Sequence, residues 1–467
     1  MYIEQFFVDG LGCASYLIGC ESKGIAAVVD PERDVQKYLD AAAARDLNIT
    51  HIIETHLHAD HVSGNTDLAE RTAAQIYIHE AANVQFPHQT LHDGDVLELG
   101  AVRIAVRHTP GHTPESVTLL VSDTTRSDQP WMALTGDLLF VGDVGRPDLV
   151  GMEAARGLAD HLYESLFHNL LQEQDHMMIY PGHGAGSLCG RSIGSVRSTT
   201  LGYEKQSNPA LEPREKDAFI DYMTTNLPEQ PGNHKRIKAM NHQGPRPLGQ
   251  ITPNALTIQE AIPHFRRGAA MLDTRPKDEF VAKHVQGAVH LPADNQLSNR
   301  IGFVLPTDVP LVLLISDESE YRQIAYSLAR VGYENVLGYL ENGIRSWEAF
   351  GLPVTSGDIE DVKPSELRAL MNNGTHSEES TPVVVDVREP WEYQSGHVAG
   401  AKLIPLGELS KRVEELDPEQ PVAVICQTGS RSQSAAALLA QRGFKKIYNV
   451  QGGMSAWENS GFEITKK

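Results

Sequence analysis

The chain has few cysteines and no long apolar run, and each absence excludes a class of protein. Its 467 residues include only Cys13, Cys20, Cys189 and Cys426. So few thiols do not form a disulfide framework, which favours a reducing cytoplasm as the place of work. No apolar run approaches the roughly 20 residues of a membrane span, and the N-terminus has no basic segment followed by an apolar core. We therefore expect neither a membrane anchor nor a signal peptide.

Positive charge is also scarce. Lys and Arg number 40 against 61 Asp and Glu, which gives a formal net charge of −21. This balance argues against nucleic acid or an anionic membrane as a partner and favours a soluble protein. The length is sufficient for about three domains of roughly 150 residues each.

Ionisable residues are concentrated in one short segment. The run from Thr55 to His61 reads Thr-His-Leu-His-Ala-Asp-His and follows an apolar, strand-like stretch, Ile49 to Ile53. Burying three imidazoles and a carboxylate at a strand end is costly unless a metal or a partner compensates them. We interpret this run as part of a metal site.

Three further loops after predicted strands carry metal-binding side chains. His112 lies in Thr-Pro-Gly-His-Thr-Pro, Asp137 in Thr-Gly-Asp, and His183 in Tyr-Pro-Gly-His-Gly. Strand ends deliver such side chains to one edge of a rigid sheet. A single histidine after a strand usually has no such role, but four loops of this kind in one domain favour a metal site.

Together these loops resemble the metallo-β-lactamase superfamily over residues 1 to about 205. The resemblance implies an αββα sandwich with the metal at one sheet edge. The segment Gly145-Arg146-Pro147-Asp148 resembles persulfide dioxygenases rather than glyoxalase II thioesterases. That resemblance implies one Fe(II) per chain, held by His56, His112 and Asp137. It also implies oxidation of glutathione persulfide, or another low-molecular-weight persulfide, by O2 to sulfite and thiol.

Four other residues of these loops, His58, Asp60, His61 and His183, stay open between two roles. They surround and orient the ligands of one iron, or they bind a second metal with Asp137 as the bridge. The second reading corresponds to a dizinc thioester hydrolase of the glyoxalase II type. Spacing does not separate the two, because the same residues serve both.

Two nearby residues also have open roles. Arg146 either pairs with Asp148 as part of the scaffold, which we favour, or faces the substrate. Cys189 closely follows the His183 loop and is either a buried inert thiol or a group on the substrate side.

Beyond residue 205 the composition changes and a repeat follows. Residues 206–250 are rich in proline. We predict a short helix over Arg214–Asn226, which begins just after Pro213, and then an extended linker. Leu272-Asp273-Thr274-Arg275 returns further along the chain as Val385-Asp386-Val387-Arg388, and the segment ending at Trp347 returns at a similar offset as the segment ending at Trp457. Each copy alternates apolar strands with helical patterns, which predicts two small α/β units with mainly parallel sheets.

In the second copy, a buried strand ends at Cys426 and a helix begins shortly after it. Backbone N–H groups and the positive end of a helix stabilise a thiolate there, and Arg431 adds charge for an anionic substrate. The copy resembles the rhodanese family, which implies that Cys426 carries sulfur as a persulfide. The resemblance makes the cradle of that persulfide the loop Gln427, Thr428, Gly429, Ser430 and Ser432.

The first copy departs from this pattern. Trp347 follows Ser316 at the same separation at which Trp457 follows Cys426. We therefore expect Ser316 at the position of the nucleophile, in a loop with three carboxylates. Serine is a poor sulfur carrier, so this copy is predicted to be catalytically silent.

We predict three domains: a metallo-β-lactamase-like domain with its linker over 1–245, a silent rhodanese-like domain over 246–356 and an active one over 357–467. The order resembles persulfide dioxygenase–rhodanese fusion proteins. It implies a bifunctional enzyme that links persulfide, sulfite and thiosulfate, with the direction of sulfur transfer left open. Related proteins imply a homo-oligomer with small-molecule substrates.

Overall fold

A computed structural model describes residues 1–191, 193–212, 215–227, 230, 232–357, 359–373 and 381–466. The chain forms two compact units, which are described separately. The first comprises Met1–Leu227, His234–Gln250 and Ala329–Gly332, and the second comprises the rest. No helix among the described residues is long and apolar enough to cross a membrane.

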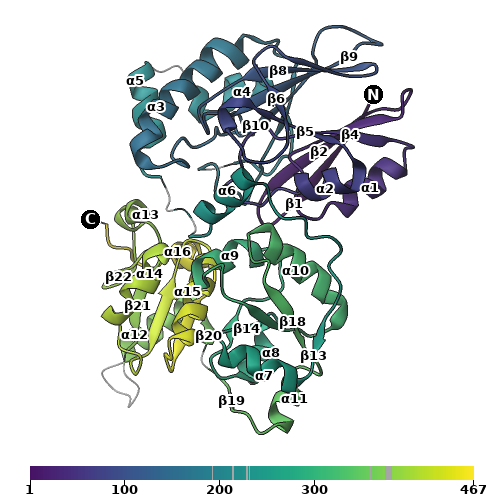
Figure 1. Cartoon of the computed structure of the whole chain (residues 1–467). Helices are drawn as coiled ribbons and strands as arrows, with labels where there is room; N and C mark the ends of the chain where they lie inside the picture. The colour runs from purple at the N-terminus through teal and green to yellow at the C-terminus, as the bar shows by residue number, and fades with distance from the viewer. Residues whose placement is uncertain are drawn as a thin grey trace. The chain divides into compact units, whose positions relative to one another are not determined.

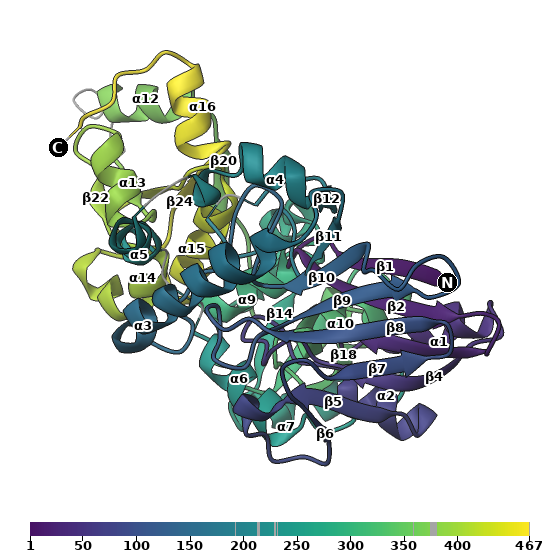
Figure 2. The same cartoon turned by 90° about the horizontal axis from the view of Figure 1, so that it is seen from above.

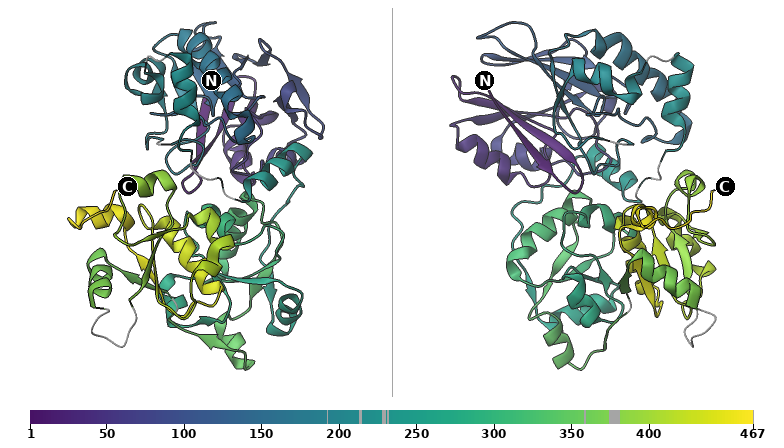
Figure 3. Two further views of the ribbon diagram at one scale, coloured as in Figure 1. Left: turned by 90° about the vertical axis from the view of Figure 1, so that its left-hand side faces the viewer. Right: turned by 180° about the vertical axis from the view of Figure 1, so that it is seen from behind.

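The first unit contains two six-stranded sheets (Figure 1). The first sheet has the order β1(Tyr2–Val8), β2(Cys13–Cys20), β3(Ile25–Val29), β4(Asn48–Ile53), β5(Gln75–His79) and β6(Gln89–Leu91). The second has the order β12(Thr199–Thr200), β11(Met178–Pro181), β10(Met132–Gly136), β9(Val117–Asp123), β8(Val102–His108) and β7(Val96–Leu99). Figure 3 shows the purple first sheet and the blue second sheet from two further sides.

The core lies between the two sheets, because residues along a strand point alternately toward the core and away from it. In β8, Val102, Ile104 and Val106 are buried and face Ile18 and Val29 of the first sheet in one apolar cluster. The outer faces are covered by helices, which are α1(Gln36–Ala43) and α2(Asn65–Thr72) on the first sheet and α3(Met152–Tyr163), α4(Leu201–Ser207) and α5(Lys216–Thr224) on the second (Figure 2). This arrangement is the predicted αββα sandwich.

The predicted extended linker is wrong, because a helix lies within it. The expected helix over Arg214–Asn226 is α5, Lys216–Thr224, while residue 214 lies outside the described residues. After it, α6 spans His234–Gln243 and belongs to the first unit. Its buried face consists of His234, Ile237 and Asn241, so it lacks the apolar stripe by which a helix is recognised in a sequence.

The second unit contains two five-stranded sheets in which all the described strand pairs are parallel. The first sheet has the order β13(Ala255–Leu256), β18(Val336–Leu340), β17(Leu311–Leu314), β14(Ala270–Asp273) and β16(Val289–His290). The second has the order β20(Ile359–Val362), β24(Ile447–Val450), β23(Val422–Ile425), β21(Val383–Asp386) and β22(Lys402–Leu403). A small antiparallel pair joins β15(His284–Val285) to β19(Val354–Thr355).

Helices accompany both of these sheets. The first copy has α7(Ile258–Arg266), α8(Lys277–Ala282), α9(Leu297–Val304), α10(Tyr321–Arg330) and α11(Ile344–Ala349). The second has α12(Pro364–Asn373), α13(Pro390–Ser395), α14(Leu406–Arg412), α15(Ser430–Gln441) and α16(Gly453–Asn459). In the second copy, α14 and α15 share one apolar cluster with the sheet, and α12 and α16 share another. The two α/β units predicted from the repeat are therefore present.

The strand register corrects the position assigned to Ser316. Asp386 of β21 is paired with Ile425, the residue before Cys426, and the equivalent Asp273 of β14 is paired with Leu314, the residue before Ile315. Ile315, not Ser316, therefore corresponds to Cys426. The equal separation from Trp347 and Trp457 was misleading. Strand β18 has a register shift near its start, where the first copy contains one residue more than the second, so the separation in the first copy is longer by one.

Candidate metal centre and sulfur-transfer loop

His56, His112 and Asp137 converge in the first unit. His56 follows β4, His112 lies between β8 and β9, and Asp137 follows β10. Asp137 Oδ2 lies 3.2 Å from His112 Nε2 and 3.9 Å from His56 Nε2. All three side chains are buried, and their ligand atoms lie within 4.8 Å of one another.

The free atoms of this triad fit a metal ion. His112 Nε2 and Asp137 Oδ2 are buried without a hydrogen-bond partner, and an unsatisfied buried polar group costs about 1–3 kcal/mol. Burial lowers the pKa of His56 and of His112, so both rings are neutral, as metal ligands must be. Two imidazoles and one carboxylate are the donor set of non-haem Fe(II) sites with open coordination positions.

Other groups fix the direction of both imidazoles. His112 Nδ1 donates to the carbonyl of Arg146 at 2.9 Å, which leaves Nε2 as the free lone pair. The Thr55 hydroxyl donates to Asp30 Oδ2 at 2.8 Å, so it accepts from His56 Nδ1 at 2.9 Å. Such outer contacts select the ring tautomer and orient the metal-binding nitrogen.

His183 bridges two carboxylates beside the triad. Its Nδ1 lies 2.7 Å from Asp137 Oδ1 and its Nε2 lies 2.7 Å from Asp60 Oδ2. Burial opposes the charge on this ring, yet Asp137 and neighbouring groups raise the pKa of His183 well above its usual value. His183 therefore holds Asp137 by one carboxylate oxygen, while Oδ2 stays directed at the two imidazoles.

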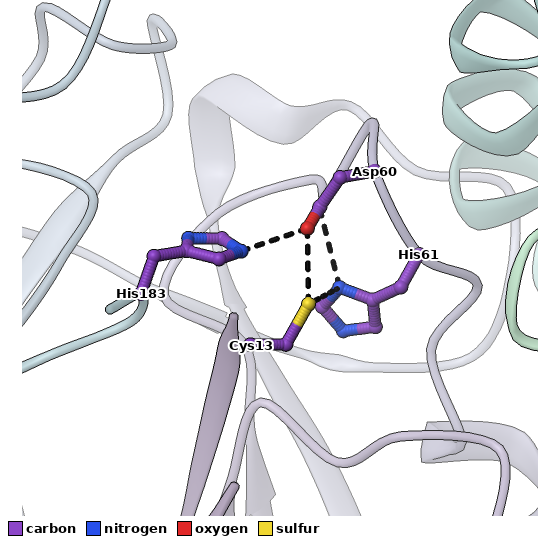
Figure 4. A group of neighbouring side chains, drawn as sticks. All are labelled: Cys13, Asp60, His61 and His183. Atoms are coloured by element: carbon purple, nitrogen blue, oxygen red, sulfur yellow. Dashed lines mark hydrogen bonds and ion pairs between the residues drawn. The ribbon is translucent and has the colours of Figure 1, made fainter. Parts of the chain in front are cut away.

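A second buried cluster of donors adjoins the triad and contains a residue that the sequence did not indicate. Figure 4 shows Cys13 pointing toward Asp60 and His61, with His183 and His61 on either side of the Asp60 carboxylate. Cys13 Sγ lies 3.1 Å from Asp60 Oδ2 and 3.6 Å from His61 Nδ1, and the four ligand atoms lie within 4.8 Å of one another. Cys13 begins β2, far from the His-rich run, and no sequence motif surrounds it.

His58 is held away from the triad ligand atoms. Its Nε2 lies 3.2 Å from Asp30 Oδ1 and 3.5 Å from Glu54 Oε2, although its ring centroid is 4.1 Å from that of His56. These two carboxylates raise the pKa of His58 although burial opposes its charge. The structure thus groups His58 with two acidic residues rather than with His56, His112 and Asp137.

Arg146 forms a bidentate ion pair with Asp148. Its Nε and Nη2 lie 2.7 Å from the two carboxylate oxygens, and its Nη1 donates to the carbonyl of Leu188 at 3.2 Å. The pair is buried, and the Arg146 carbonyl holds His112. Cys189 is also buried, and its sulfur belongs to a donor cluster with Asp137 and His183. Burial raises the pKa of Cys189 well above its usual value, so it is a neutral thiol.

Helix α6 clamps the His-rich run. Asn241 Nδ2 donates to the carbonyls of His58 and His61 at 2.8 Å each, and its Oδ1 accepts from Ser63 N at 2.9 Å. Both N–H groups of this amide are thus used, and Asn241 is buried. Asn241 therefore holds the backbone of the metal loop, a role that the proline-rich sequence around it did not indicate.

In the second unit, Cys426 directly follows β23 and is 1% exposed. Its Sγ accepts from the backbone N–H of Gly429 at 3.1 Å and lies 3.5 Å from Ser432 Oγ. Among the other residues of the predicted cradle, Ser430 begins α15 and Thr428 is exposed. The loop thus turns at least one N–H group toward the sulfur, as the sequence predicted for a strand followed by a helix.

Side chains from neighbouring elements hold this loop. Gln427 accepts from Arg388 Nη1 at 3.0 Å and donates to Ser455 Oγ at 3.1 Å. Arg431 does not stand free in the loop: its Nη1 and Nη2 each lie 2.7 Å from an oxygen of Glu392 on α13. Glu392 is a further residue that sequence reasoning missed, although it closely follows the Asp-Val-Arg-Glu segment.

Comparisons with known proteins agree with both parts of the chain. The model of the metallo-beta-lactamase superfamily matches residues 8–183, and the model of the rhodanese-like domain matches residues 257–350 and 363–460. Persulfide dioxygenase ETHE1, mitochondrial, of Bos taurus is 30% identical over 212 residues, covering 45% of this chain and 75% of that protein. The chain belongs to the metallo-β-lactamase superfamily. This superfamily member also carries two rhodanese-like domains.

Two further relatives bear on its function. Hydroxyacylglutathione hydrolase GloC of Haemophilus influenzae is 28% identical over 207 residues, covering 40% of this chain and 87% of that protein. A solved metallo-beta-lactamase from Staphylococcus aureus subsp. aureus COL has 32% identity and a TM-score of 0.65, covering 73% of this chain and 98% of that one. The protein is thus a metallo-β-lactamase-fold enzyme with two rhodanese-like domains.

Proposed function

We propose that this protein is an Fe(II)-dependent persulfide dioxygenase joined to a sulfurtransferase. It oxidises glutathione persulfide, or another low-molecular-weight thiol persulfide, with O2 to sulfite and thiol. The observation that carries the proposal is the buried His56, His112 and Asp137 triad with its unsatisfied nitrogen and oxygen. The similarity to persulfide dioxygenase ETHE1 and the Gly-Arg-Pro-Asp segment support it.

The residues of the triad and its surroundings have distinct tasks. His56, His112 and Asp137 would hold the iron, which supplies open positions for O2 and for the persulfide sulfur. Thr55 and the Arg146 carbonyl keep the two imidazoles aimed, and His183 keeps Asp137 in place by its second oxygen. Because these groups are buried, bulk water is excluded from the ligand atoms.

The second site uses the product of the first. Sulfite attacks the outer sulfur of the Cys426 persulfide, the S–S bond breaks, and thiosulfate leaves with Cys426 restored as a thiolate. The sulfane sulfur moves without any outside oxidant or reductant. Cys426 must be a free thiol before it is loaded, so a reducing compartment such as the cytoplasm is part of the proposal.

A second candidate is a two-metal thioester hydrolase. It is favoured by the donor cluster of Asp60, His61 and His183 beside the triad and by the similarity to hydroxyacylglutathione hydrolase GloC. In this case Asp60, His61 and His183, together with Asp137, would hold a second metal, and zinc would take the place of iron.

Single substitutions in each site test whether the two activities are separate. Asp137→Ala removes one donor of the triad and should abolish metal binding and O2 uptake while sulfur transfer stays within about twofold. Cys426→Ser should abolish sulfur transfer while persulfide-dependent sulfite formation continues. O2 electrode traces, sulfite assays and metal analysis of both variants check this. Loss of sulfite formation in Cys426→Ser would contradict two separable sites.

A further inference from the structure

The Cys426 loop carries an arginine whose charge is already matched. Arg431 is the only cation between Cys426 and Ser432 in the sequence, and Glu392 engages it through two hydrogen bonds of 2.7 Å. Arg388, which reaches the loop through Gln427, is paired in the same way with Asp386 at 2.7 Å. Both guanidinium groups near the loop are therefore compensated by carboxylates.

Glu392 is built into its position. Its Oε2 accepts from the backbone N–H of Glu389 at 3.0 Å and so caps the start of α13, and the residue is 8% exposed. Burial disfavours its charge, yet the pair with Arg431 holds the pKa of the Glu392 carboxyl below its usual value. The carboxylate therefore stays charged at neutral pH and keeps cancelling the charge of Arg431.

The silent copy provides a comparison within the chain. Glu279 corresponds to Glu392 at the same offset that relates Asp273 to Asp386. The strand register places Glu320 where Arg431 stands. Without that arginine, the Glu279 side chain is 50% exposed, lies 3.9 Å from Arg275 Nη1 in a long ion pair and accepts a long bond of 3.4 Å from Ser316. A buried glutamate that binds the loop arginine through both oxygens is thus found in the copy that has the cysteine.

We propose that Glu392 makes Cys426 select organic persulfides over thiosulfate as its sulfur donor. This inference rests on the sulfur transfer proposed above. Thiosulfate brings two negative charges to the loop, whereas the reacting end of a persulfide brings at most one. A loop whose arginine is neutralised offers a dianion mainly backbone N–H dipoles such as that of Gly429, because the Ser432 hydroxyl donates to the Gly429 carbonyl. The uncompensated loop of Glu392→Gln should admit the dianion, and it should equally speed sulfite attack on the Cys426 persulfide, which is the reverse of loading by thiosulfate.

The loading step balances without a further reactant. The Cys426 thiolate attacks the terminal sulfur of R–S–SH, a new S–S bond forms, and the old S–S bond breaks. The electron pair leaves on R–S⁻, which takes up a proton to give the thiol. Cys426 is left as a persulfide, and the donor is neither oxidised nor reduced beyond this exchange.

The test compares two donors on the full-length protein without O2, so that the metal site does not consume persulfide. Intact-mass measurements follow the loading of Cys426 by thiosulfate and by glutathione persulfide. In Glu392→Gln, the ratio of the thiosulfate rate to the persulfide rate should rise about tenfold, because the removed carboxylate repels a dianion about twice as strongly as a monoanion. Glutamine also caps a helix at this position, so α13 is preserved.

Three controls separate selectivity from structure. Glu392→Asp keeps the charge and should keep the wild-type ratio. Glu415→Gln removes a similar carboxylate, paired with Arg412 at 2.6 Å, and should also leave it unchanged. Iodoacetamide labelling of Cys426 at neutral pH should be faster in Glu392→Gln alone, because an uncompensated cation favours attack by the thiolate.

An unchanged ratio in Glu392→Gln, or an equal shift in Glu392→Asp, would overturn the role of Glu392. The proposed sulfur transfer fails in a different way. If the wild-type protein is loaded by neither donor, or if Cys426→Ser is loaded as fast, Cys426 is not a sulfur carrier. If the wild type is loaded at Cys426 but Glu392→Gln leaves the ratio unchanged, Cys426 is a sulfur carrier and only the selectivity assigned to Glu392 is refuted.

Discussion

At the scale of single residues, the metal site depends on groups that do not touch the metal. Thr55 is the clearest case, because its hydroxyl lies between Asp30 and His56. Asp30 accepts the hydroxyl proton, so the oxygen of Thr55 is left to accept from the imidazole. One hydroxyl thereby selects the tautomer that leaves Nε2 free for metal.

Thr55→Val should weaken metal binding by about 10–100-fold, since loss of an outer contact to a ligand has this effect. The ligands themselves remain, so metal should still bind at high concentration. Competition with a chelator measures the affinity. Thr50→Val is a matched control, because Thr50 lies 2.8 Å from the ring of the neighbouring His51 on the same strand but outside the triad. Equal affinities in Thr55→Val and the wild type would contradict this role.

At the scale of elements, strand ends place the chemistry in both units. His56 and Asp137 follow strands of the two stacked sheets, and Cys426 follows a central strand of a parallel sheet. In the rhodanese-like copies, the pairing of β14 with β17 and of β21 with β23 determines which residue stands at the nucleophile's position.

This register has a chemical test. Ile315 is 8% exposed whereas Ser316 is exposed. In a Cys426→Ser background, a cysteine introduced by Ser316→Cys should react readily with iodoacetamide. The cysteine of Ile315→Cys should react at least about tenfold more slowly, because it is buried and, unlike Cys426, has Glu320 rather than an arginine in its loop. The reverse order of rates would restore Ser316 to the buried position.

The start of α16 packs against the backbone of the Cys426 loop. Met454 N donates to the Cys426 carbonyl at 2.8 Å, and Gly453 has a φ of +56°. A Cβ at Gly453 would lie 2.2 Å from that carbonyl oxygen. Gly453→Ala should therefore destabilise the domain by about 1–3 kcal/mol and slow sulfur transfer at least about tenfold.

Gly461→Ala is the control for this substitution. Gly461 also has a positive φ, +69°, but a Cβ there meets nothing within 4 Å. It should cost about 1–2 kcal/mol for the backbone alone and leave sulfur transfer unchanged. Thermal unfolding and thiocyanate formation from cyanide measure both effects. Equal losses of sulfur transfer in Gly453→Ala and Gly461→Ala would refute the role of the close contact between Gly453 and the Cys426 carbonyl.

The sequence predicted the elements that have strong local patterns. β4 contains the apolar run Ile49 to Ile53 that predicted it, and the His-rich run with the loops of His112 and Asp137 supplied every member of the triad. Other features depend on contacts between distant segments. Cys13 meets Asp60 only through the fold, α6 has one apolar residue on its buried face, and a strand irregularity moved the register by one. No local pattern encodes these three.

At the scale of the whole molecule, two kinds of sulfur chemistry occur in one chain. The first unit holds the candidate metal centre and the second holds both rhodanese-like copies, with Cys426 in one of them. The proposed reactions are complementary, because the sulfite made in the first is an acceptor for sulfur from the second. The boundaries at 245 and 356 stay predictions.

The most direct test of the account is the metal content of the freshly isolated protein, measured together with its O2 uptake on glutathione persulfide. We predict about one iron per chain, persulfide-dependent O2 consumption and sulfite as the product. About two zinc ions per chain, with no O2 uptake, would contradict the account and favour the thioester hydrolase.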